Sequence, residues 1–426
     1  MRWSVASSLL VLLVGAGCAT VDPGPDYARA AEEVAATTGF HELFDPAELA
    51  EWKERVAVLA ADGLTASDAA QIALLNNSRL RAAMYSLGVG RADVVQAGLF
   101  TNPSFGISYR LSSGPARVGL FLAQNIADLW QIPSRQDAAE RQQGSLILQV
   151  AGEASELVAV ARRSYWRTVG AERLAELAAD AESLARTGLD VAAERHRAGS
   201  GTLVDVNLAR SALSELGIEA RMARLTAATA RLELYQVLGI QDSAATLTLT
   251  PAPHRDLAGL PSDEELVDSG LRCRLDLKAA ERAVAAAEAA IAYQERRLFQ
   301  SVNAGVDFER DDQDSIGPAI ELSLPIFDQN QAQISRAQFE YLRVTSLRDA
   351  LACDAEQEIL TFPRKSGHPI CAEARGCSHV EEETTEVQRR AKGGRRSHGA
   401  RDRQPLAGCP RSGPDRDGVA PLGQAG

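Results

Sequence analysis

The sequence predicts a mainly helical protein in which long antiparallel helical hairpins are joined to paired β-hairpins. Composition is the first reason: aromatic residues make up only 5% of the chain, and alanine-rich stretches such as residues 279–292 favour long, closely packed helices. The second reason is an internal repeat, because one pattern of helix and alternating segments recurs about 200 positions later. The third is the alternation itself, which indicates strands with one apolar face.

Residues 1–17 have the layout of a secretory signal peptide, with an apolar run at residues 9–14 followed by small residues. This run is too short to span a bilayer. A cysteine directly after small residues resembles a lipoprotein cleavage box, in which Cys18 becomes the lipidated mature N-terminus. Gly15 stands where such a box usually has leucine, so ordinary cleavage without lipidation remains open. Residues 18–64 are then an N-terminal anchor or extension.

Residues 65–261 form the first structural repeat. Thr65 and Asp68 have the spacing of a capping box, so a helix is expected to begin there. A β-hairpin is predicted at 99–128, because apolar and polar residues alternate on both sides of a polar turn. The alternating apolar residues are Phe105, Ile107, Tyr109 and Leu111, followed by Val118, Leu120 and Leu122.

The rest of this repeat is predicted to be a long helical hairpin. One helix extends from Gln131 to Arg197, because no proline follows Pro133 and apolar residues recur at helical spacing. Residues 198–202, which contain Gly199, Ser200 and Gly201, form the tip turn between the helices. The return helix ends near Gly239, and three prolines mark the following residues, to position 261, as a connector.

Residues 262–362 form a second, incomplete repeat. A helix from Ser262 to Leu298, with Glu265 completing its capping box, precedes a β-hairpin at 299–327 and the start of another helix. The helix is expected to stack end to end with the return helix, so that both run back along the long one. The alternating apolar residues are Val302, Ala304, Val306 and Phe308, then Ile320, Leu322, Leu324 and Ile326, with a turn at 311–315.

The height and apolar face of each hairpin suit strands that cross an outer-membrane bilayer. Four strands from one chain cannot close a barrel, and an open sheet edge is not tolerated in lipid, so several protomers must share the barrel. Three protomers would give twelve strands and leave a pore. The alternative is a half-buried sheet in a soluble protein.

Two segments resemble the TolC family of outer-membrane efflux proteins. One is the turn between the helices, which contains Gly199, Thr202, Leu203, Asp205, Val206 and Arg210 in order. The other is the junction from Leu324 to Arg336, and Asp276 with Leu277 sits at a usual helix start of the family. The similarity covers residues 65 to about 360. The lipoprotein-like start and the residues at 95–103 look most like the branch that serves drug and heavy-metal efflux pumps.

The resemblance implies a homotrimer whose twelve-stranded β-barrel continues into an α-helical barrel through the periplasm. It implies a passive conduit, not an enzyme, that docks onto a periplasmic adaptor protein and an inner-membrane transporter. The tip residues Gly199, Ser200, Gly201 and Thr202 match the family's adaptor-contact turn. Asp205 and Arg210 match positions of the ion-pair network that holds the entrance closed. The alternative for Asp205 is a capping box with Thr202, and both roles are compatible.

The chain after Phe362 departs from this pattern. Residues 363–426 carry 12 basic against 8 acidic residues, no aromatics and no helical rhythm. We expect a frameshift or truncation near position 362, or else a disordered basic tail. A frameshift would leave the channel incomplete and the chain without a channel function. His368, Cys371, Cys377 and His379 offer zinc-binding groups, but their spacing fits no standard finger.

Several classes of function are disfavoured by the sequence. A formal net charge of −12 makes nucleic acid an unsuitable partner. No phosphate-binding glycine loop, metal-binding histidine pair or nucleophile elbow is present, so neither an enzyme, a metal site nor a cofactor is expected. No stretch of 18 consecutive apolar residues predicts a membrane-spanning helix. The main rival is a lipid-anchored periplasmic coiled-coil protein with a structural role. The exported substrate is not encoded in any motif.

Overall fold

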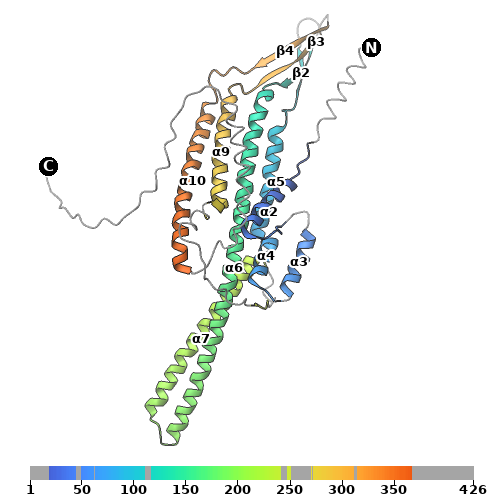
Figure 1. Ribbon diagram of the computed structural model, residues 1–426. Coiled ribbons are helices and arrows are strands. Elements are labelled where there is room, and N and C mark those ends of the chain that lie inside the picture. The colour runs from blue at the N-terminus through green and yellow to red at the C-terminus, as the bar shows by residue number, and fades with distance from the viewer. Residues whose placement is uncertain are drawn as a thin grey trace, which may run out of the picture.

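The computed structural model describes residues 19–44, 49–61, 63–110, 117–240, 247–250, 270, 272–310 and 314–366. It is an elongated molecule (Figure 1). A four-stranded sheet lies at one end, a group of packed helices forms the middle, and a single helical hairpin projects at the opposite end. Cys18, the tail from 367 onward and the turn at 111–116 lie outside the described residues, as does the capping box predicted at Ser262 and Glu265.

The opening of the first repeat contains two helices instead of the single one expected. Helix α4 (Ala66–Asn76) begins at the predicted capping box, in which the Thr65 side chain accepts from the Asp68 N–H. Asn77 interrupts the helix in an extended conformation and caps helix α5 (Ser78–Gly98) through its side-chain oxygen. Its amide nitrogen donates to the Val237 carbonyl at 2.8 Å, so this break also ties α4 to the end of the return helix.

The long helix is present as α6 (Asp128–Arg197), which has 70 residues and a length of about 105 Å at 1.5 Å per residue. It begins three residues before the predicted Gln131, because the Asn125 side chain already accepts from the Ala127 N–H. Helix α7 (Leu203–Leu238) returns beside it and ends at Gly239, which adopts the left-handed conformation that glycine favours.

The second repeat is built from helices α9 (Leu275–Arg296) and α10 (Gln331–Ser366). The predicted helix from Ser262 to Leu298 is not continuous, because Arg274 adopts an extended conformation immediately before α9. Arg274 forms ion pairs with Asp276 and with Glu358, both at 2.7 Å, and thereby links the start of α9 to the far part of α10. Helix α10 also continues four residues past Phe362, the boundary drawn from composition.

The strands β1 (Ser104–Arg110), β2 (Arg117–Asn125), β3 (Val302–Arg310) and β4 (Asp314–Leu322) form one antiparallel sheet in the order β1-β2-β3-β4. The two predicted hairpins are therefore hydrogen-bonded to each other. The last strand lies earlier than predicted: it begins at Asp314, inside the expected turn, and ends at Leu322. Leu324 and Ile326 follow it outside the sheet.

The core lies where the helices of both repeats surround the upper half of α6. Helix α2 (Gly24–Thr38) packs on α6 together with α4, α5, α7 and α9, and α3 (Leu49–Ala61) packs on α4. Ala151, Ala154 and Ala161 of α6 are fully buried, and their small side chains allow neighbouring helices to approach closely. Tyr165 closes this region and donates to the Thr250 carbonyl at 2.7 Å.

Among the described residues, α6 is the one helix long and apolar enough to qualify as a membrane span by length and composition. The sequence rule of 18 consecutive apolar residues had disfavoured any such helix. Packing against neighbouring helices buries 44% of the qualifying window inside the protein.

Candidate functional site

The sheet has one apolar and one polar face, because its cross-strand pairs keep like residues together. Ile107 pairs with Leu120, which pairs with Phe308, which pairs with Ile316. The next row toward the helices continues the same face with Phe105, Leu122, Val306 and Pro318. The opposite face carries small and polar side chains, namely Gly106, Ser108, Asp307, Glu309, Gly317 and Glu321, together with Phe121.

The apolar face is not covered by any described part of the chain. Ile107 is 67% exposed, Phe105 64%, Ile316 75% and Ile320 76%. A continuous apolar surface of this kind marks a contact with lipid or with another protein. The outer edges of β1 and β4 also have no neighbouring strand among the described residues. The sheet thus has the exposed apolar face and the open edges that a shared membrane barrel requires.

The predicted tip residues form the compact turn between α6 and α7. Gly199 has φ 77°, a left-handed conformation that ends α6. The Ser200 N–H donates to the Arg195 carbonyl at 2.9 Å, and a Cβ on Gly201 would lie 3.2 Å from the His196 nitrogen. A side chain at Gly201 would therefore press on the last turn of α6. The turn is exposed, and Leu203 and Val204 beside it are 59% and 73% exposed.

Asp205 is engaged in the capping box of α7. The Thr202 N–H donates to the Asp205 carboxylate at 2.8 Å, and the Thr202 side chain accepts from the Asp205 N–H at 3.2 Å. The hydrogen bond from the Thr202 backbone is the main cause that lowers the pKa of Asp205 below its ordinary value. No ion pair joins Arg210 to any part of the chain that the structure describes. The structure thus places Asp205 in the cap and does not bring it together with Arg210.

We expect the tip turn to loosen under acidic conditions. A depressed pKa means that the stabilisation by Asp205 is complete above about pH 3.9, the ordinary value, and is lost as pH falls through the lower folded-state pKa. Hydrogen exchange at residues 199–205, corrected for intrinsic rates, should therefore accelerate on acidification. Asp205→Asn should remove most of this pH dependence; an unchanged pH dependence in that variant would contradict the assignment.

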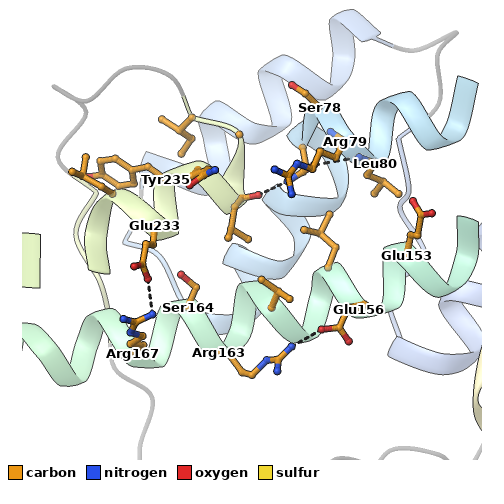
Figure 2. A pocket seen from close by; sticks show the side chains of 18 residues that line it. Ser78, Arg79, Leu80, Glu153, Glu156, Arg163, Ser164, Arg167, Glu233 and Tyr235 are labelled. Carbon is orange, nitrogen blue, oxygen red and sulfur yellow. Dashed lines mark hydrogen bonds and ion pairs between the residues drawn. The ribbon is translucent and has the colours of Figure 1, made fainter. Parts of the chain in front are cut away.

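A groove of about 1170 Å³ lies between the sheet and the tip, where the start of α5, the middle of α6 and the end of α7 meet (Figure 2). Its charged side chains are largely paired with each other: Arg163 contacts Glu156 at 2.5 Å and Arg167 contacts Glu233 at 2.6 Å. Leu80, with other apolar side chains, lines the remainder. The groove contains no convergent set of unpaired acids, bases and nucleophiles, so its chemistry does not indicate catalysis.

A buried ionic contact that the sequence did not reveal fixes the N-terminal segment to the helices. Asp26 of α2 is fully buried and accepts from the Arg91 Nε at 2.7 Å and from the Gln143 side chain at 3.0 Å. A Cβ at Gly90 would lie 2.0 Å from the Gln143 Oε1, so a larger residue there would require the Gln143 side chain to shift. Neither Asp26 nor Arg91 stands in a recognisable motif, and no periodic signal distinguishes them from surface charges.

Comparison with known proteins shows what this fold is similar to. Residues 69–240 match the family described as "Outer membrane efflux protein". Among solved structures, the chain is similar to the outer membrane protein VceC from Vibrio cholerae, with 16% identity and a TM-score of 0.56 over 78% of this chain and 87% of that one. The Campylobacter jejuni CmeC outer membrane channel gives 15% identity and a TM-score of 0.57 over 76% and 74% of the two chains.

CusC, whose structures concern folding and transmembrane channel formation, gives 17% identity and a TM-score of 0.53 over 70% of this chain and 72% of that one. No curated protein sequence matches the chain significantly. At these identities the solved structures establish the fold alone, and the family match covers residues 69–240, which is less than half of the chain. Both agree with the resemblance to the TolC family that the motif at Gly199–Arg210 indicated.

Proposed function

We propose that this chain is the channel protomer of a tripartite efflux pump, and that three copies assemble one barrel and one helical tunnel. The observation that carries the proposal is the four-stranded sheet with an exposed apolar face and two open edges. Twelve strands from three copies pair every edge, and the apolar face then contacts outer-membrane lipid. The polar face, with Asp307, Glu309 and Glu321, lines a water-filled lumen.

In this proposal the tip at Gly199–Thr202 contacts a periplasmic adaptor, and an inner-membrane transporter supplies the energy. Asp205 caps α7 and, with Arg210, takes part in closing the entrance between copies. Cys18 carries the lipid that anchors the N-terminus in the outer membrane. The chain catalyses no reaction. Drugs or metal cations are the proposed cargo, in agreement with the resemblance to pumps of that branch.

Two neighbouring substitutions in β1 test the membrane role. Ile107 lies on the apolar face and Ser108 on the polar face, and both side chains are exposed in the single chain. An arginine facing lipid costs about 2–4 kcal/mol at the bilayer midplane, whereas one facing a wet lumen costs little. We therefore expect Ile107→Arg to deplete the trimer from the outer-membrane fraction and Ser108→Arg to leave it nearly unchanged.

The soluble alternative gives a different result for the same pair. If the sheet is water-exposed in a periplasmic scaffold, both arginines are tolerated, and the chain is released from membranes once its N-terminal anchor is cleaved. Equal behaviour of the two variants, together with a monomeric, water-soluble chain after anchor removal, would overturn the channel proposal.

A further inference from the structure

One large aromatic side chain lies on the polar face of the sheet. Phe121 stands in the middle of β2 between Leu120 and Leu122, so strand alternation turns its side chain away from the apolar face. The ring is partly exposed in the single chain. Contact with lipid cannot account for it, because the proposed lipid contact is made by the other face. A phenylalanine that faces a water-filled lumen therefore has no role in anchoring the sheet.

The surroundings of Phe121 leave its ring open to the lumen. Its cross-strand partners are Gly106 on β1 and Asp307 on β3. The ring leans toward Gly106, since a Cβ added there would lie 4.0 Å from the Phe121 Cδ1. Most of the remaining neighbours on this face are small, namely Ser104, Ser108, Gly119, Ala123 and Gly305. None of these side chains is large enough to cover the ring.

The charge directly beside the ring is negative. Asp307 is exposed and forms no ion pair with any described residue. Cross-strand partners have Cβ atoms about 4.5–5.5 Å apart, so this carboxylate adjoins the Phe121 ring. The other acids of this face are engaged, because Glu309 pairs with Arg117 at 3.9 Å and Glu321 accepts a side-chain hydrogen bond at 3.3 Å. Among the described carboxylates of the polar face, Asp307 is therefore the one most available to a ligand.

We propose that Phe121 and Asp307 form a weak binding site for organic cations in the lumen, a site that rests on the export function proposed above. The face of an aromatic ring attracts a cation through its quadrupole, and the adjacent carboxylate adds an opposite charge. Both contacts favour a cation with an apolar, weakly hydrated body, such as a quaternary ammonium or a charged aromatic dye. A small metal cation keeps its hydration shell and gains little from the ring. The favoured cargo is therefore an organic cation and not a hydrated metal ion.

A weak site of this kind suits a conduit. Rotation about the axis of a trimer preserves height, so three copies place three equivalent sites at one level of the barrel. Conduction requires binding that is favourable enough for entry and weak enough for release. One exposed ring and one exposed carboxylate meet this condition, because each contributes modestly in water. The three sites thus concentrate an organic cation in the barrel without trapping it.

Ethidium binding to the full-length chain, extracted from the outer membrane, tests the site by fluorescence anisotropy. Phe121→Leu keeps an apolar side chain and removes the ring, so ethidium should bind about 3- to 10-fold more weakly. Phe121→Tyr keeps the ring and should bind nearly as the unmodified chain does. Asp307→Asn should weaken binding by a similar factor and reduce its dependence on salt. Phe105→Leu removes an aromatic ring from the apolar face of the same sheet, and this matched control should leave the affinity unchanged.

Competition separates the ring from the general acidity of the lumen. Tetraethylammonium should displace ethidium more effectively than Mg²⁺ does at equal ionic strength. Stronger displacement by Mg²⁺, or equal losses in Phe121→Leu and Phe105→Leu, would overturn the site.

The remaining outcomes distinguish this site from the export function. A trimer that conducts ions but binds no ethidium would exclude the site and leave the export function standing. If Phe121→Leu fails to assemble, Asp307→Asn decides, and unchanged affinity in that variant would contradict the proposal. A monomeric, water-soluble chain would overturn both proposals.

Discussion

Arg91→Ala is expected to release helix α2 from the body of the protein. The substitution leaves the carboxylate of Asp26 fully buried, with the Gln143 amide as its remaining side-chain donor. Removing one partner of a buried ion pair costs about 3–5 kcal/mol, because the other charge stays desolvated without compensation. Local opening of one segment costs less than global unfolding, so α2 should detach while the other helices remain packed.

Hydrogen exchange across Gly24–Thr38 is the direct measurement, since protection there should fall while protection in α6 remains. Arg173→Ala is the matched control, because Arg173 is 85% exposed and its ion pair with Glu176 contributes little. If α2 stays protected in Arg91→Ala, the hydrophobic contacts of Ala30 and Val34 hold the helix in place. The ion pair between Asp26 and Arg91 is then not required.

Gly305→Val is expected to separate the two β-hairpins. Gly305 of β3 lies opposite Ala123 of β2, and a Cβ there would come within 2.2 Å of the Leu122 carbonyl oxygen. The obstacle is backbone in a hydrogen-bonded ladder, so it cannot move aside without breaking the β2–β3 pairing. Overpacking typically costs 1–3 kcal/mol, and we expect about 3 kcal/mol or more here.

The same substitution at Gly317 provides the comparison. Gly317 lies in β4 of the same sheet, and no described atom lies within 4 Å of the position that a Cβ would take there. Gly317→Val should therefore retain the strand signal in circular dichroism and the yield of membrane-inserted protein, both of which Gly305→Val should reduce. Similar losses in both variants would show that valine itself, and not the β2–β3 approach, is responsible.

The elements with strong local signals could be predicted from the sequence. Alternation placed the β-hairpins, the capping box at Thr65 placed α4, and helical spacing with the Gly199 turn placed α6 and α7. These signals are local because strand alternation, caps and turns depend on a few neighbouring residues. The helix breaks at Asn77 and Arg274 were missed, because each is stabilised by distant partners, Val237 and Glu358 respectively.

The candidate site could be predicted only in part. The tip residues lie together because they are consecutive, but the pairing of the two hairpins into one sheet required contacts between the repeats. The contacts among Asp26, Arg91 and Gln143 join residues up to 117 positions apart. No periodic pattern in the sequence indicates such contacts. The proposed role of Arg210 with Asp205 requires contacts between copies, which one chain does not contain.

The joining of β2 to β3 also determines the order in which the molecule can form. Each β-hairpin closes over a short turn, whereas the Asn125 side chain reaches the Val302 N–H across 177 residues of chain. Closing so large a loop costs conformational entropy, which slows the step. We therefore expect each β-hairpin to form early in folding and the β2–β3 pairing to form late. Until α6 and α9 pack together, the hairpins β1–β2 and β3–β4 remain separate, and their apolar faces are exposed to water. Chaperoned delivery to the membrane would then be most needed during that interval.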